Sequence, residues 1–165
     1  MTVPRSQVVL SVPNSWEALD AAALDPSDQA GSDRLAEVAR RTHVEMSDLR
    51  QQLRQLDLVL AGPAGSSSQV TLDMQGMDAL PTDGEIYQQL APVAAGRVDI
   101  RRFHSAVGDA LTASYDMSPE TGGANVRLTA LHVDEGVLLV VVSSPEATTS
   151  KSIEADTLGH IHRKA

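Results

Sequence analysis

The chain has 165 residues, a length suited to one domain with a substantial core. Hydrophobic residues make up 42% of it and aromatic residues only 2%, so Val, Leu, Ala and Met must build the core. So few rings disfavour a surface on which nucleic-acid bases stack, and a net charge of -9 disfavours contact with phosphate backbones. We therefore expect a single domain, residues 1–165, that does not bind nucleic acid.

The absence of cysteine excludes disulfides, thiolate catalysis and zinc sites with cysteine ligands. The first five residues lack the pattern of a signal peptide, and the longest apolar run, residues 137–142, is too short to span a bilayer. We expect a cytoplasmic protein without a membrane span. An export signal removed beforehand would leave the same sequence, in which case the location is extracytoplasmic. Few lysines beside many arginines are typical of a GC-rich bacterial genome.

The first third of the chain predicts a strand followed by a helix. Residues 8–12 alternate as a short strand that ends at Pro13, and we expect Trp16 to cap an edge of the core with its N–H on a polar partner. Residues 32–56 carry apolar side chains at steps of three and four, which predicts an amphipathic helix with Ser32 as N-cap and a kink near Ser47. This helix covers a sheet face or, alternatively, joins a coiled coil with a partner.

The middle of the chain predicts two strands and a second helix. Residues 57–61 and 69–75 form strands that pair antiparallel across a loop at residues 62–68. A helix then runs over residues 84–95, with Thr82 or Asp83 as its cap.

The last third predicts four strands and a final helix. Residues 98–107 and 110–117 pair around a Gly108-Asp109 turn, and residues 125–144 form a hairpin with a three-residue turn that places Gly136 in the left-handed region. The run at residues 137–142 is apolar at every position, which predicts a central strand buried on both faces. The last helix starts at Ser144-Pro145 and turns these side chains inward: Ile153, Thr157, Leu158 and Ile161.

The predicted order of elements is β-α-β-β-α-β-β-β-β-α, without βαβ alternation. We therefore predict an α+β fold, a mostly antiparallel sheet sandwiched by helices in α/β/α layers.

No motif for catalysis, metal or cofactor binding stands out. The loop at residues 62–68 lacks the Lys-Ser/Thr of a phosphate-binding loop, and no Gly-x-Ser-x-Gly elbow exists. His160 and His162 either hold a metal at a frayed helix end or complement the helix dipole, and the second interpretation is favoured. The competing hypothesis is a small hydrolase or other enzyme that pairs His104 or His132 with a carboxylate. We expect no cofactor and no metal.

The sequence resembles the PsbP-like fold superfamily over roughly residues 8–161. The Val12-Pro13-Asn14-Ser15-Trp16 segment is similar to the Val-Pro-x-x-Trp entry of that superfamily, and the strand at residues 108–115, the hairpin and the terminal helix follow in the same order. Members include the photosystem extrinsic protein, a Ran-binding import factor, DcrB-type and LpqN-type bacterial envelope proteins and Eag-type effector chaperones. The resemblance implies a fold without enzymatic chemistry and leaves the partner open.

We therefore predict a non-catalytic protein-binding module, an adaptor or secretion-associated chaperone of a bacterial cell, acting as a monomer or homodimer. Its partner is another protein, in the narrower form an apolar segment of a secreted protein. The predicted contact surface is an exposed sheet face, or the groove beside the second helix. The residues predicted to line it are Met74, Met77, Leu80, Tyr87, Leu111 and Tyr115.

Overall fold

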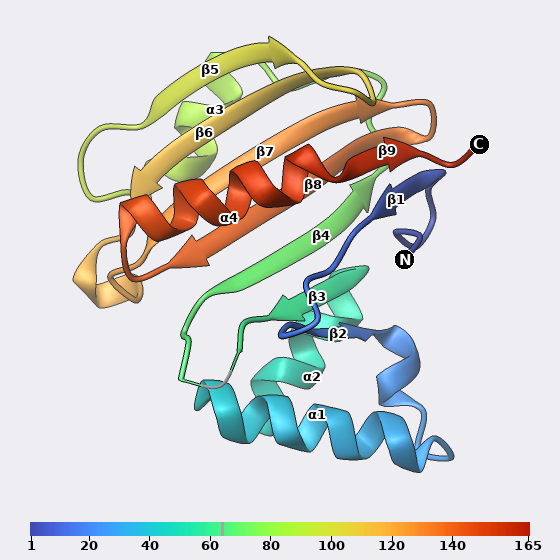
Figure 1. Ribbon diagram of the computed structural model, residues 1–165. Coiled ribbons are helices and arrows are strands. Elements are labelled where there is room, and N and C mark those ends of the chain that lie inside the picture. Colours follow the sequence, from blue (N-terminus) through green and yellow to red (C-terminus); the bar gives the residue numbers. More distant parts are fainter. Residues whose placement is uncertain (64) are drawn as a thin grey trace.

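The computed structural model describes residues 1–63 and 65–165, Thr121 by its backbone alone (Figure 1). The helices are α1 (Gln29–Thr42), α2 (Met46–Gln55), α3 (Asp83–Leu90) and α4 (Ala147–Gly159), with short 3-10 turns at Ala21–Leu24 and Pro119–Thr121. The strands are β1 (Val8–Leu10), β2 (Glu17–Asp20), β3 (Leu58–Ala61), β4 (Gln69–Gln75), β5 (Asp99–His104), β6 (Asp109–Asp116), β7 (Asn125–Val133), β8 (Gly136–Ser144) and β9 (Ile161–Arg163).

Seven of these strands form one sheet in the order β2-β3-β4-β8-β7-β6-β5, and every pair of neighbours is antiparallel. β1 and β9 form a separate two-stranded sheet beside it (Figure 1). The predicted α+β class, with helices on a large antiparallel sheet, is confirmed.

The hairpin of β7 and β8 is the centre of the sheet. β8 lies fourth of the seven strands, between β4 and β7, as its apolar sequence predicts. The turn is shorter than predicted, because Gly136 already pairs with Val133 and leaves only Asp134 and Glu135 in the loop. Gly136 does take a positive φ of 138°.

One face of the sheet is covered by α4 together with β1 and β9, and we call it the α4 face (Figure 1). Alternate residues of the central strands point to it, because side chains in a strand project to opposite sides in turn. The cluster on this face contains Leu58, Leu72, Leu138 and Val140 from the sheet and Val8, Leu10 and Ile161 from the small sheet.

A buried carboxylate ties α4 to the strands beneath it. Glu154 accepts hydrogen bonds from Thr112 at 3.0 Å, from Thr129 at 2.7 Å and from the Nε of Arg127 at 2.5 Å. The two threonine hydroxyls also meet each other at 2.8 Å. These partners satisfy a charged group that would otherwise be costly to bury, and they fix the position of α4 over β6 and β7.

The opposite face is covered at its two ends only. α1 and α2 pack on β2 and β3, while α3 packs on β6 and β7. Between the helices, the side chains of Leu128, Leu139 and Val141 are only half-buried. The central strand is therefore fully buried on the α4 face, but the prediction that it is buried on both faces holds only in part.

The predicted helix over residues 32–56 is two helices. His43 adopts a left-handed conformation with φ of 56° at the end of α1, and α2 starts three residues later. Asp28, not Ser32, caps α1 by accepting a hydrogen bond from the Gly31 N–H. Both helices pack on this chain's own sheet, as the favoured interpretation predicts.

The second predicted helix is α3, which starts where predicted and ends earlier than predicted. Thr82 and Glu85 form a reciprocal capping box at the start of α3, whose last residue is Leu90 instead of residue 95. β4 has the predicted bounds and pairs antiparallel with β3.

Two strands and one turn differ from the prediction. β2 lies at the start of a poorly periodic stretch that predicts a loop or a short irregular helix, and β9 replaces the predicted helical end around Ile161. The turn between β5 and β6 comprises residues 105–108, four residues instead of Gly108-Asp109. Both unpredicted strands are short and become strands through distant partners, which a local pattern does not reveal.

Candidate functional site

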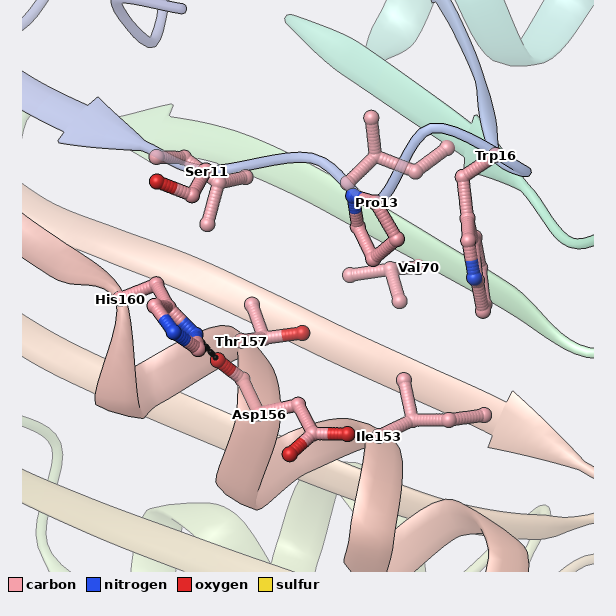
Figure 2. A pocket seen from close by; sticks show the side chains of 10 residues that line it. Ser11, Pro13, Trp16, Val70, Ile153, Asp156, Thr157 and His160 are labelled. Carbon is pink, nitrogen blue, oxygen red and sulfur yellow. Dashed lines mark hydrogen bonds between the residues drawn. The ribbon is translucent and has the colours of Figure 1, made fainter.

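An apolar cleft opens on the α4 face between α4 and the segment that connects β1 to β2. We call it the Trp16 cleft. In Figure 2, Pro13 and Trp16 lie on the side of the connecting segment, and the α4 residues lie opposite. Its lining residues are Leu10, Ser11, Pro13, Trp16, Leu60, Val70, Ile153, Asp156, Thr157 and His160.

The interior of the cleft is apolar because its base is part of the hydrophobic core. Leu10, Leu60 and Val70 form its base and belong to the buried cluster beneath α4. Trp16 and Ile153 are half-buried and pack on that cluster from either side. The cleft has a volume of about 240 Å³.

Trp16 is the only tryptophan of the chain. It lies at the edge of the core, as predicted, but the expected polar partner is missing. Across residues 1–63 and 65–165, its indole N–H has no hydrogen-bond partner. A ring with an apolar body and a free donor can bind both a side chain and a carbonyl group of a ligand.

The α4 side of the cleft carries hydrogen-bond acceptors. His160 Nδ1 lies 2.8 Å from the backbone oxygen of Asp156, and a carbonyl oxygen only accepts, so Nδ1 carries the proton in this contact. In neutral His160 the other ring nitrogen, Nε2, is then an acceptor. The Asp156 carboxylate lies along the same helix between His160 and Ile153 (Figure 2).

The six residues predicted to bind a partner do not form one surface. Met74 belongs to the cluster under α4, whereas Leu111 and Tyr115 lie on the opposite face under α3. Met74 is 5% exposed and Leu111 is fully buried, so a concave surface lined by Met74, Met77 and Leu111 does not exist in this structure. Burial also raises the pKa of the Tyr115 phenol above its ordinary value.

The remaining three predicted residues surround α3. Met77 and Leu80 are half-buried against the cluster under this helix. Tyr87 is 49% exposed, and its hydroxyl lies 3.4 Å from the carbonyl of Val98. A hollow does lie beside α3, and of the six predicted residues only Tyr87 lines it, together with Ala91, Ala94, Gly96, Arg97 and Val98.

One of the two histidines of the enzyme hypothesis meets a carboxylate. His104 Nδ1 lies 2.9 Å from Asp109 Oδ1 in a shallow hollow that His132 also lines. The two side chains are 78% and 74% exposed, so water surrounds the pair. Near it, Arg163 binds Asp134 at 2.7 Å.

Two carboxylates meet around one guanidinium at the edge of β3 and β4. Arg5 donates to both oxygens of Asp57, at 2.7 and 2.8 Å, and to Asp73 at 3.2 Å. Burial and the nearby Asp57 charge raise the pKa of Asp73 in spite of Arg5. The single guanidinium holds the pair together, so this cluster is a structural clamp on the N-terminal segment.

The serine-rich loop leads to the start of α4. Ser68 Oγ donates to Ser144 Oγ at 3.1 Å, so this buried serine is used within the fold. Ala64, in the predicted loop, lies outside the described residues. In the described part of the chain, no three His, Asp or Glu side chains are grouped so that they could hold a metal ion. No helix there is long and apolar enough to cross a bilayer.

The Trp16 cleft was missed because its walls come from four separate parts of the sequence. Two signals pointed to it, the Val-Pro-x-x-Trp segment and the inward positions Ile153 and Thr157 of the last helix. Neither signal shows that the two segments face each other across a gap.

Comparisons with known proteins agree with the architecture. No protein-family model matches the sequence, and no curated protein matches it. Among solved structures, the chain is similar to the solution structure of cyanobacterial PsbP (CyanoP) from Synechocystis sp. PCC 6803. The two share 9% sequence identity with a TM-score of 0.56 over 99% of this chain and 90% of the other. At this identity the likeness concerns the fold alone, and with the layers and strand order above it shows that the chain has a PsbP-like fold.

Proposed function

We propose that the protein is a non-catalytic protein-binding module, an adaptor or secretion-associated chaperone of a bacterial cell, that holds an apolar side chain of a partner protein in the Trp16 cleft. The observation that carries this proposal is the apolar cleft itself, whose base is formed by the core residues Leu10, Leu60 and Val70 and whose walls include the half-buried Trp16. Interfaces are commonly anchored by a side chain that fills such a pocket.

The size of the cleft favours a side chain over a cofactor. Pockets for cofactors and drug-sized ligands usually measure about 300–1,000 Å³. The Trp16 cleft, at about 240 Å³, falls below that range. A partner protein would therefore place one large apolar residue here and make its remaining contacts on the surrounding surface.

Selection of peptides from a random library displayed on phage tests the proposal. The library is selected against the wild-type protein, and the recovered peptides are then measured against two α4 variants. Ile153→Arg places a long charged side chain in the cleft, and Ala155→Arg adds the same charge at an exposed position of the same helix. We expect peptides with a shared apolar residue that lose binding to Ile153→Arg and keep it to Ala155→Arg.

The fluorescence of Trp16 gives a second readout that needs no variant. Because it is the only tryptophan of the protein, we expect a tryptophan-free peptide that enters the cleft to change its emission. Recovery of no peptide above background, or of peptides that bind both variants equally and leave the emission unchanged, would overturn the proposal.

The narrower chaperone role has a separate test. Light scattering follows the aggregation of an apolar peptide with and without the protein. Wild-type protein should suppress scattering, and Ile153→Arg should not. If neither suppresses it, the chaperone role is rejected while the binding module stands.

A second candidate function is hydrolysis, favoured by the 2.9 Å contact between His104 and Asp109. A catalytic pair benefits from a site that excludes water, and both of these side chains are largely exposed. The rate of p-nitrophenyl acetate hydrolysis tests whether the His104–Asp109 pair is catalytic. A wild-type rate above that of His104→Ala and of free imidazole would support an enzyme and contradict the non-catalytic proposal.

A further inference from the structure

We infer that the partner segment carries a lysine or arginine close to the apolar residue that enters the Trp16 cleft, and that Asp156 binds this cation. The inference rests on the proposed function, because it assigns the chemistry of the partner at the same site. It follows from three observations on α4 and the chain as a whole.

The first observation is that the Asp156 carboxylate has no cationic partner of its own. Of the carboxylates that line clefts, Asp57 pairs with Arg5 and Asp134 with Arg163, whereas in residues 1–63 and 65–165 neither Asp20 nor Glu146 pairs with an arginine or lysine. Asp156 forms no such pair within the described chain, although it lines the cleft and is exposed. Its charge is therefore available to a ligand.

The second observation is that the neighbouring group is an acceptor as well. His160 is exposed and uses its Nδ1 on the Asp156 backbone oxygen, so that Nε2 is left to act as an acceptor when the ring carries one proton. A carboxylate and an imidazole acceptor four residues apart on one helix lie on the same side of it. Together they match a group rich in donors, such as an ammonium or a guanidinium.

The third observation is the charge of the whole protein. A net charge of -9 attracts cationic segments and repels acidic ones before any contact forms. An acidic or phosphorylated segment would bring like charge to Asp156. A partner segment with a basic residue beside an apolar one therefore suits the cleft, because the apolar residue fits its interior and the basic residue fits Asp156 at its edge.

The test compares peptide selections against the wild type, Asp156→Lys and Asp78→Lys. Asp78 is an exposed loop residue outside the cleft, so its variant makes the same change in net charge and is the matched control. We expect the wild type and Asp78→Lys to enrich Lys or Arg within four residues of the apolar residue. Asp156→Lys should lose this enrichment and favour Asp or Glu there.

A direct measurement follows with the most frequent selected peptide and its Lys→Gln or Arg→Gln version. Exposed ion pairs are weak, so we expect the neutral peptide to bind wild-type protein about two- to fivefold more weakly. It should bind Asp156→Asn as tightly as the basic peptide does. Raising the salt concentration should narrow the wild-type difference.

The outcomes separate this inference from the proposed function. Enrichment of an apolar residue without basic neighbours would overturn the inference and leave the binding module intact. An equal loss of the preference in Asp78→Lys would also overturn it, because the net charge and not Asp156 would then be the cause. Failure to enrich any apolar residue would overturn both.

Discussion

Gly108 occupies a position where a side chain would collide with a neighbouring strand. A Cβ atom added there would lie far inside van der Waals contact with the backbone oxygen of His132, and its φ of 152° disfavours other residues. Gly136 meets the same restriction against the backbone oxygen of Gln75. The close approach of strands at this end of the sheet depends on these two glycines.

We expect Gly108→Ala to lower the free energy of unfolding by about 2–3 kcal/mol, because both the strain and the collision must be relieved by backbone movement. Urea denaturation measures the change. Gly84→Ala is the control, since α3 leaves open space there and alanine favours a helix by about 0.5–1 kcal/mol. A Gly108→Ala protein as stable as the wild type would contradict the geometry.

Asp73 is the residue from which a pH dependence of stability can be derived. Its folded-state pKa is raised, first by burial and then by the charge of Asp57. Between the ordinary pKa and the raised one, the folded state binds more protons than the unfolded state. Its contribution to stability therefore falls as pH rises through this window and stays unfavourable above it.

The variant Asp73→Asn carries no charge at any pH. We expect it to be more stable than the wild type at pH 7, and the difference should shrink as pH falls through the raised pKa and vanish below the ordinary aspartate pKa of about 4. Thermal unfolding at a series of pH values checks this. Asp78→Asn, at an exposed position, should show no such trend. A wild type more stable than Asp73→Asn at pH 7 would show that the Arg5 contact outweighs burial.

At the scale of elements, the break between α1 and α2 depends on a left-handed residue. His43 has a φ of 56°, a conformation that costs residues other than glycine about 1–3 kcal/mol. The break lets α2 turn back, so that Leu35, Val38, Leu49 and Leu53 enter one cluster.

Replacement of His43 by glycine should raise the free energy of unfolding by about 0.5–1 kcal/mol, because the relief of strain exceeds the greater entropy of the unfolded chain. Ala36→Gly, on the exposed side of α1, should instead lower it by about 1 kcal/mol. Denaturant titration distinguishes the two signs. Equal destabilisation by both substitutions would contradict the left-handed assignment.

Sequence patterns predicted elements well where the elements are long and amphipathic. β4, the β7–β8 hairpin and the cap of α3 have local signals, alternation or a Thr-x-x-Glu pattern, that the structure uses directly. β2 has four residues and β9 has three, and each strand has one buried side chain. These strands are too short to show the alternation of apolar and polar residues that identifies a strand. Their conformations come from pairing with β3 and β1, far away in the sequence.

The candidate site was less predictable for a related reason. Alternation shows that Met74 and Leu111 each point to a buried side of a strand, but it does not say whether the two sides are the same. The register from β4 through β8 and β7 to β6 places them on opposite faces. The Trp16 cleft likewise exists only through the packing of α4 against a segment about 140 residues earlier in the chain.

At the scale of the whole molecule, the last strand completes the core under α4. Ile161 is 2% exposed and packs with Val8 and Leu10 of β1. The two ends of the chain thereby stabilise one another across the α4 face.

We expect Ile161→Ala to cost about 2–4 kcal/mol of unfolding free energy, the usual range for a buried isoleucine cut to alanine. His162→Ala, an exposed neighbour on the same strand, should change it by less than about 0.5 kcal/mol. Calorimetry of both variants measures the difference. A similar loss of unfolding free energy in the two variants would mean that β9 does not pack on the core.

The pairing of β1 with β9 also has a mechanical consequence. Val8 pairs with Arg163 and Leu10 with Ile161, so the chain enters β1 and leaves β9 at the same end, while the N-terminal residues fold back to pair Thr2 with Val9. Tension applied between Met1 and Ala165 would first detach this folded-back segment, whose Met1 amine donates to the Leu10 carbonyl at 2.8 Å, and would then break the β1–β9 hydrogen bonds one after another. β1 leads into the segment that carries Trp16, and β9 follows α4 (Figure 1). Separation of the two strands under load would therefore detach the two walls of the cleft from one another. In single-molecule pulling we expect this opening at lower force than the unfolding of the seven-stranded sheet, and with it the release of whatever the cleft holds.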